Sequence, residues 1–169
     1  LLAGLEPGVM FGPLQNKMQF EKVKGFLEAG KKDGRLVAGG ETGDKGYFIR
    51  PAIIADIKEG SPLVDEEQFG PVLPVIKFKD VEDALARANA SPYGLGGSVW
   101  SANLDRALAV ANRMECGTVW INKHLELANH LPFGGAKASG MGVEMGEEGL
   151  NEFTQLQVVN IAKAPKAAA

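Results

Sequence analysis

The sequence is poor in the residues that form disulfides and bind metal ions. Its 169 residues include one cysteine and two histidines. A single cysteine excludes an internal disulfide and a zinc site built from several cysteines. Two histidines argue against a histidine-rich metal site. We therefore expect no metal centre in this protein.

The chain also lacks an excess of positive charge and a long apolar run. It has 18 Lys and Arg against 21 Asp and Glu, which gives a net charge of −3. Proteins that bind nucleic acid need a basic surface, so we expect no nucleic-acid partner. No run reaches the roughly 18 apolar residues of a membrane span, and the first residues do not resemble a secretion signal. We expect no membrane association and a cytoplasmic location.

Glycine, in contrast, is abundant. It accounts for 22 of the 169 residues, against a typical share of about 7%. Because glycine and proline together stay below the range of disordered chains, the glycines are expected to serve tight turns in a folded domain. The chain begins with Leu1 rather than Met, which indicates that residue 1 is not the natural start.

The hydrophobic pattern predicts alternating strands and helices. Apolar residues at helical spacing predict a helix over 14–32, and Ser61, Asp80 and Asn103 are placed to begin three others. A further short helix is expected over 144–150. The expected strands are 35–38, 47–57, 72–78, 97–100, 118–122 and 157–161, with Pro51 making the second an edge or broken strand. This order favours an α/β fold with three αβα layers and a mostly parallel sheet.

Several motifs fail when they are tested against their chemistry. The spacing of Gly135 and Gly140 fits a phosphate-binding loop, but Met141 and Gly142 stand where such a loop needs Lys and Ser or Thr. Cys116 lies between a predicted helix end and a strand. The partial negative charge of a helix C-terminus opposes thiolate formation, so this thiol is expected to be inert. His124 and His130 are interpreted as surface-loop residues.

Three sequence segments, taken together in this order, are specific enough to indicate a protein family. They are Glu66-Glu67-Gln68-Phe69-Gly70-Pro71, Gly117-Thr118-Val119-Trp120-Ile121-Asn122, and Pro132-Phe133-Gly134-Gly135 followed by Ser139-Gly140 and Glu144. Together they resemble the C-terminal part of the catalytic domain of the NAD(P)-dependent aldehyde dehydrogenase superfamily. The resemblance covers residues 5–163. It implies that 1–152 is a partial catalytic domain and that 153–163 is a C-terminal oligomerisation strand. The composition of 164–169 predicts a disordered tail.

The resemblance also implies roles for five residues. Glu67 would accept hydrogen bonds from the nicotinamide ribose hydroxyls, and Phe69 would pack against the nicotinamide. Asn122 and Phe133 would line the substrate pocket, with 123–131 at the aldehyde entrance, and Glu144 would relay protons. Other interpretations remain: a surface acid for Glu67, core aromatics for Phe69 and Phe133, and a helix-start carboxylate for Glu144. The glycines at 134, 135, 140 and 142 would allow turns around this pocket.

The implied function is oxidation of an aldehyde to a carboxylic acid with NAD or NADP as cofactor. The nucleophilic cysteine and the general-base glutamate of the family precede the matching region, and Cys116 does not match the nucleophile motif. The chain is therefore expected to be truncated, inactive by itself, and homo-oligomeric through its C-terminal strand. Two alternatives stay open: a stand-alone binding or assembly module that pairs with full-length subunits, and a relative of the acyl-CoA or acyl-phosphate reductases.

Overall fold

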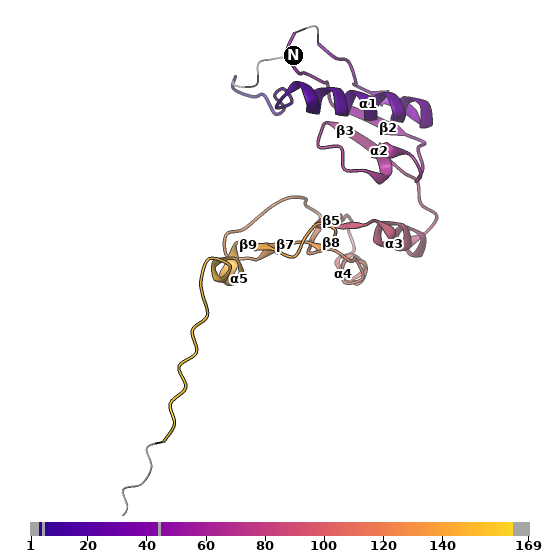
Figure 1. Cartoon of the computed structure of the whole chain (residues 1–169). Helices are drawn as coiled ribbons and strands as arrows, with labels where there is room; N and C mark the ends of the chain where they lie inside the picture. Colours follow the sequence, from indigo (N-terminus) through magenta and orange to yellow (C-terminus); the bar gives the residue numbers. More distant parts are fainter. Residues whose placement is uncertain (1–3, 5, 44, 164–169) are drawn as a thin grey trace, which may run out of the picture. The chain divides into compact units, whose positions relative to one another are not determined.

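The chain folds into two compact units. The computed structural model describes residues 4, 6–43 and 45–163, and its units are Leu1–Lys79 and Asp80–Ala169. Figure 1 colours the chain along the sequence, from indigo at the N-terminus to yellow at the C-terminus. The division falls inside the segment 1–152 that was expected to form one partial domain. The disordered tail expected at 164–169 lies outside the described residues.

Helix α1 (Lys17–Asp33) dominates the first unit. It begins at Asn16, whose side-chain oxygen accepts a hydrogen bond from the backbone N–H of Gln19 at 2.9 Å. The hydrophobic pattern predicted a start at Leu14, because the apolar spacing extends to this residue. The capping residue, however, is Asn16. The buried face of the helix is the predicted one, formed by Phe20, Val23, Phe26, Leu27 and Gly30.

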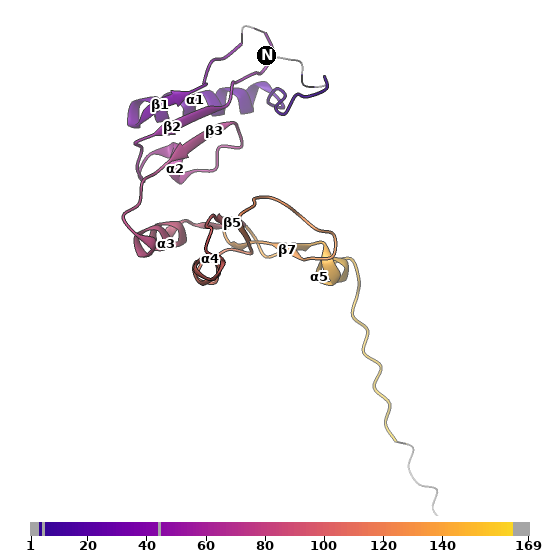
Figure 2. The ribbon, with the colours of Figure 1, turned by 180° about the vertical axis from the view of Figure 1, so that it is seen from behind.

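A three-stranded sheet packs against this helix. Its strands are β1 (Arg35–Ala38), β2 (Ala52–Ala55) and β3 (Val72–Val75), in the order β1-β2-β3. Strands β1 and β2 are antiparallel, whereas β2 and β3 are parallel, so this sheet is mixed (Figure 2). Pro51 precedes β2 and interrupts the expected strand 47–57, but β2 is central rather than at the edge. This is tolerated because Pro51, which lacks an N–H, lies outside the ladder.

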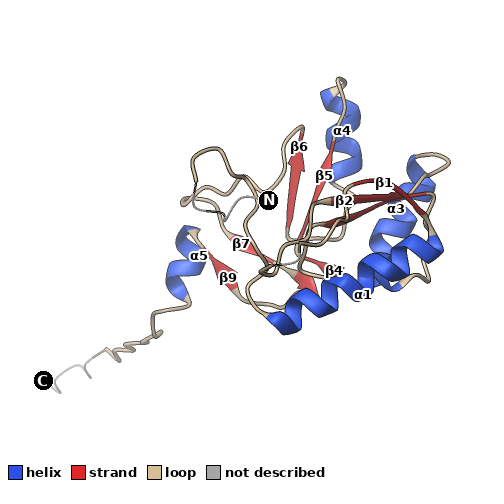
Figure 3. Ribbon diagram, turned by 90° about the horizontal axis from the view of Figure 1, so that it is seen from above, coloured by secondary structure: helices blue, strands red, loops and turns tan. Residues whose placement is uncertain are grey.

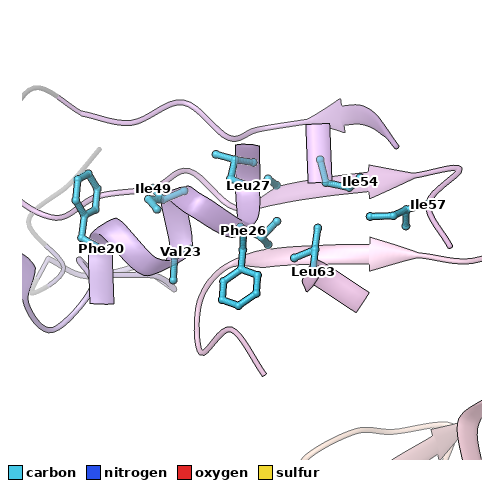
Figure 4. Packing of buried hydrophobic residues seen from close by; sticks show 10 residues of the cluster. Phe20, Val23, Phe26, Leu27, Ile49, Ile54, Ile57 and Leu63 are labelled. Carbon is cyan, nitrogen blue, oxygen red and sulfur yellow. The ribbon is translucent and has the colours of Figure 1, made fainter. Parts of the chain in front are cut away.

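The core of the first unit lies between the helices and one face of the sheet. Figure 4 shows Leu27 of α1, Ile54 of β2 and Leu63 of the short helix α2 (Pro62–Asp65) converging there. Strand alternation leaves Ile53 and Leu73 exposed on the opposite face. Within the described residues of this unit, helices therefore cover one face of the sheet.

The second unit combines one parallel and two antiparallel strand pairs. Its elements are α3 (Val81–Ala90), β4 (Tyr93–Gly94), β5 (Gly96–Val99), α4 (Leu104–Ala111), β6 (Thr118–Ile121), β7 (Phe133–Gly134), β8 (Ala136–Lys137), β9 (Val143–Glu144) and α5 (Gly146–Asn151) (Figure 3). Strands β5 and β6 are parallel, while β4 pairs with β8 and β7 with β9 in antiparallel fashion. The expectation of a mostly parallel sheet is thus corrected to mixed pairing. Short antiparallel pairs form because the glycine-rich segment after β6 folds back on the strands.

Helix caps in this unit follow the sequence. Asp80 and Asn103 accept hydrogen bonds from the backbone N–H groups of Asp83 and Arg106, both at 2.9 Å. One helix start differs, because α5 begins at Gly146 and Glu144 belongs to β9. Helix α4 ends at Ala111, six residues before Gly117.

The last described residues extend beyond α5. Residues 155–163 are exposed throughout and form neither helix nor strand, and Figure 1 draws them as a yellow trace without regular structure. The strand expected at 157–161 is not formed in the described chain, because a strand needs a neighbour to complete its hydrogen bonds. No described helix has both the length and the apolar character needed to cross a membrane.

Candidate functional site

The segment that carries Glu67 and Phe69 is fastened to α1 through its backbone. The Gln19 side-chain amide donates to the carbonyl oxygens of Gln68 and Phe69, at 2.7 and 2.9 Å. One turn further along α1, the Lys22 ammonium donates to the Glu67 carbonyl at 3.1 Å. Three successive carbonyl groups are thus held by two side chains of one helix.

This fastening keeps the segment in an uncommon conformation. Phe69 has a positive φ of 47°, which is costly for a bulky residue unless its surroundings hold it there. Gly70 lies so close to α1 that an added Cβ would come within 2.5 Å of a Val23 methyl group. The Phe69 ring is nevertheless 72% exposed. The Glu67 side chain is exposed too, with no hydrogen-bond partner among the described residues. Both side chains are therefore available to a ligand.

Replacing Gln19 with alanine is expected to loosen this segment. The substitution removes both amide donors while Lys22 and the packing of Gly70 remain. We expect amide hydrogen exchange at Val72, whose N–H donates to the Gly70 carbonyl at 2.9 Å, to quicken about tenfold, since the loss of two hydrogen bonds loosens residues 67–70. Gln15, which precedes the helix, supplies the matched control in Gln15→Ala. Equal exchange rates in the wild-type and Gln19→Ala chains would contradict the fastening role.

Asn122, at the end of β6, uses its side chain to hold the neighbouring connection. Its amide oxygen accepts from the Ser101 N–H at 2.8 Å, and its amide nitrogen donates to the Ser101 carbonyl at 2.9 Å. Asn122 has a φ of 56°, a conformation that asparagine adopts more readily than most residues. The side chain of this predicted pocket residue thus ties β6 to the segment between β5 and α4.

Phe133 and Glu144 are brought together as partners across a strand pair. Phe133 of β7 lies opposite Glu144 of β9 in the antiparallel register. The Phe133 side chain is half-buried, whereas the Glu144 carboxylate is exposed and has no hydrogen-bond partner among the described residues. Gly149 of α5 permits this arrangement, because a Cβ there would lie 2.6 Å from the Glu144 carbonyl carbon. An apolar ring and a carboxylate therefore share one strand pair.

An aromatic cluster adjoins this pair. The Trp120 ring of β6 lies 5.5 Å from the His124 ring, centroid to centroid, in an edge-on arrangement. It also lies 6.5 Å from the Phe133 ring. The Trp120 indole N–H donates to the Glu126 carbonyl at 2.9 Å. Trp120 thus links β6, the segment 123–131 and Phe133.

The cysteine does not have the character of a nucleophile. The Cys116 thiol is half-buried, with its sulfur 3.5 Å from the Thr118 carbonyl oxygen. Burial raises the pKa of the Cys116 thiol, and the Lys137 charge offsets this only in part. A raised pKa leaves little thiolate near neutral pH. In the described part of the chain, no group of three or more His, Cys, Asp or Glu is placed to hold a metal ion.

The predicted residues thus form two groups, one in each unit. Glu67 and Phe69 share one fastened segment of the first unit. Phe133 and Glu144 share a strand pair of the second unit, which also holds Asn122 at the end of β6. Sequence reasoning missed the positioning roles of Gln19 and Lys22. Trp120 belongs to one of the segments that carry the family resemblance, but the sequence does not indicate which group its indole N–H contacts.

Comparison with known proteins finds matches over most of this chain. The model of the Aldehyde dehydrogenase family matches residues 2–159. The chain is 41% identical over 157 residues to the rat "Aldehyde dehydrogenase, cytosolic 1", covering 92% of this chain and 31% of the rat protein. It is 45% identical over 152 residues to an aldehyde dehydrogenase of Davidiella tassiana, covering 89% of this chain and 31% of the relative.

A solved structure shows the same similarity in three dimensions. The aldehyde dehydrogenase from Bacillus cereus, solved as an NAD+ complex, has a TM-score of 0.85 and 42% sequence identity, and the match covers 90% of this chain and 32% of that one. The chain therefore spans about a third of the length of the relatives it matches. Because the family model covers most of its residues, the chain belongs to the aldehyde dehydrogenase family.

Proposed function

We propose that this chain supplies the nicotinamide-side cofactor contacts and part of the aldehyde pocket of an NAD(P)-dependent aldehyde dehydrogenase. The observation that carries the proposal is the segment 67–70. Its backbone is fastened to α1, while the side chains of Glu67 and Phe69 remain exposed. Two residues with fixed backbones and available side chains are what a bound cofactor needs for orientation.

Glu67 and Phe69 suit the two chemically different ends of a nicotinamide riboside. The Glu67 carboxylate is an acceptor with two oxygens, and a ribose diol offers two adjacent donors. The Phe69 ring offers an apolar face against which the nicotinamide packs. NAD(P)+, when bound, accepts the hydride from the substrate. Within this proposal, Glu67 orients the ribose and Phe69 limits movement of the ring.

Asn122, Phe133 and segment 123–131 are assigned to the aldehyde side. The Phe133 ring forms an apolar wall that excludes water from the substrate's body. Asn122 contributes the rigid start of 123–131 through its bonds to Ser101. We assign to Glu144, which lies opposite Phe133, the role of receiving and releasing a proton through water. The reaction we propose for the whole enzyme is attack by a cysteine thiolate, hydride transfer, and hydrolysis of the thioester to a carboxylic acid.

The chain by itself is expected to turn over no aldehyde. Cys116 is held half-buried and protonated rather than poised for attack. The test compares the purified chain with a chimera in which its residues 6–163 replace the matching segment of the Bacillus cereus enzyme. The chimera should form NADH from an aldehyde and NAD+, measured at 340 nm, and the chain alone should not. Turnover by the chain that is lost in Cys116→Ser would contradict the proposal.

The role of Glu67 is tested in the same chimera. Glu67→Gln should raise the KM for NAD+ about tenfold, because a hydrogen bond to a charged acceptor is weakened. Glu66→Gln changes an exposed carboxylate next to it and should leave this KM within about twofold. Equal increases in both variants would remove the assignment. A product that forms only with added coenzyme A or phosphate would favour the acyl-CoA or acyl-phosphate reductase alternative.

A second candidate function is supported by the exposed C-terminal segment. Phe153, Leu156, Val158, Val159 and Ile161 are all exposed, and an unpaired apolar segment of this kind readily adds to a sheet edge. The chain would then act as an assembly module for full-length subunits, or join homo-oligomers through this strand. Failure to co-elute with a full-length homologue in gel filtration would remove this candidate.

A cytoplasmic location remains part of the proposal, since the rat relative is named as cytosolic.

A further inference from the structure

Trp120 occupies a rigid place in the second unit. Its side chain is 5% exposed, and it lies opposite Ser98 in the parallel pairing of β5 and β6. Gly96 of β5 approaches the indole so closely that an added Cβ would lie 2.7 Å from a ring carbon. The absence of a side chain at Gly96 therefore leaves the space that the ring occupies. The orientation of the indole N–H is fixed by this packing.

The segment 123–131 receives several of its contacts from this indole. The nine residues contain no helix or strand in the described structure, so they rely on side-chain and turn contacts. The Trp120 N–H holds the Glu126 carbonyl near the middle of the segment, and His124 packs edge-on against the ring. At the far end, the backbone N–H of Gly146 donates to the Asn129 carbonyl at 3.1 Å. Trp120 thus holds the first half and α5 holds the second.

The held segment presents apolar side chains. Leu125, Leu127 and Leu131 are exposed, and Leu125 adopts a positive φ of 53° that a branched side chain rarely takes without restraint. The Glu126 carbonyl bonded to Trp120 lies between Leu125 and Leu127 in sequence. The same indole adjoins Phe133. One buried ring therefore governs where several apolar groups lie.

We infer that Trp120 is a positioning residue that fixes segment 123–131 beside Phe133 and thereby sets which aldehydes the site accepts, favouring those with an apolar body. The inference rests on the proposed function for the substrate, but the anchoring itself stands on the contacts of Trp120. Leucine side chains gain by burying hydrocarbon and offer neither a hydrogen bond nor a counter-charge to a charged substrate. Displacing the segment would change this apolar wall, while the contacts that hold Glu67 and Phe69 to α1 would remain.

The chain offers a matched control for the anchoring, because it has two tryptophans. Trp100 is 65% exposed and its N–H donates to the Ser98 hydroxyl within its own strand region. Trp120→Phe keeps an aromatic ring but loses the N–H, and Trp100→Phe makes the same chemical change elsewhere. In Trp120→Phe we expect amide exchange at Leu131, whose N–H donates to the Ala128 carbonyl at 2.9 Å, to quicken about fivefold, and Trp100→Phe should leave this rate unchanged.

His124→Ala provides a second variant that leaves the buried ring in place. It should quicken exchange in 123–131 by a smaller factor than Trp120→Phe, because the bond to Glu126 remains. Circular dichroism checks that each variant keeps its helices. Unchanged exchange in both Trp120→Phe and His124→Ala would overturn the anchoring role, even if Trp120→Phe lowers overall stability.

The effect on aldehydes is measured in the Bacillus cereus chimera. Trp120→Phe should lower the ratio of kcat/KM for hexanal to that for succinic semialdehyde, which carries a carboxylate, at least about threefold, with the KM for NAD+ unchanged. An unchanged ratio would overturn the inference while leaving the proposed function intact. An unmutated chimera that folds but forms no NADH would instead count against the proposed function, and the exchange measurement would still decide the anchoring.

Discussion

Replacing Gly117 with alanine is expected to destabilise the second unit by about 3 kcal/mol, the upper range for overpacking a core. An added Cβ at Gly117 would lie 1.7 Å from the Gly134 carbonyl oxygen and 2.6 Å from its carbon. Neither atom belongs to a flexible side chain, so the backbone of β7 must move. Because Gly134 follows Phe133 and pairs with Val143, the shift would also displace the strand pair that carries Glu144.

The measurement for Gly117→Ala is urea unfolding followed by tryptophan fluorescence. Both tryptophans lie in the second unit, so this signal reports on it directly. Gly142→Ala is the matched control, since an added Cβ there meets no heavy atom of the described residues within 4 Å. We expect the control to unfold within about 1 kcal/mol of the wild type. Equal midpoints for Gly117→Ala and the wild type would show that β7 does not lie against Gly117.

Leu27→Ala is expected to cost the first unit about 3 kcal/mol, in the range measured for emptying a buried leucine site. The Leu27 side chain is 1% exposed and belongs to the cluster between α1 and the sheet (Figure 4). Its removal leaves a cavity next to Gly40, whose own missing side chain offers nothing to fill it. The loss therefore combines transfer of hydrocarbon with lost packing.

Far-UV circular dichroism during urea unfolding follows this change, because α1 is the longest helix of the described chain. Leu73→Ala removes the same atoms from a position on β3 that is 59% exposed, and it should cost less than about 1 kcal/mol. A similar loss in both variants would mean that Leu73 is also buried in solution. A loss confined to Leu27 would support the single covered face of the sheet.

Much of the local structure could be predicted from the sequence because its causes act over short distances. The buried face of α1 follows from apolar residues three and four positions apart. The caps at Asp80 and Asn103 need only an oxygen acceptor three residues before an N–H. The segments around Glu67, Trp120 and Phe133 were identified from their residues and order. These features are properties of neighbouring residues.

Strand pairing was harder to predict, because it depends on which later segments the fold brings beside each strand. Pro51 suggested an edge or a broken strand. The strand is broken at the proline, but β2 is central, since β1 and β3 pair with its two sides after Pro51. Glu144 looked like a helix-start carboxylate until β9 formed opposite β7. Apolar runs show that strands exist, but they carry little information on direction. The mixed sheets result from segments that are distant in sequence pairing in both directions.

The sequence by itself indicated the family, the buried face of α1, the caps at Asp80 and Asn103, and five candidate site residues: Glu67, Phe69, Asn122, Phe133 and Glu144. Only the tertiary structure decided what holds them. Gln19 reaches carbonyl groups 49 and 50 residues away, and Gly117 meets the backbone of Gly134. Such contacts depend on the folded path of the chain, because neither residue has a local pattern that names its distant partner. The physical reason is that periodicity and capping are set by adjacent turns, whereas positioning is set by packing between segments far apart in sequence.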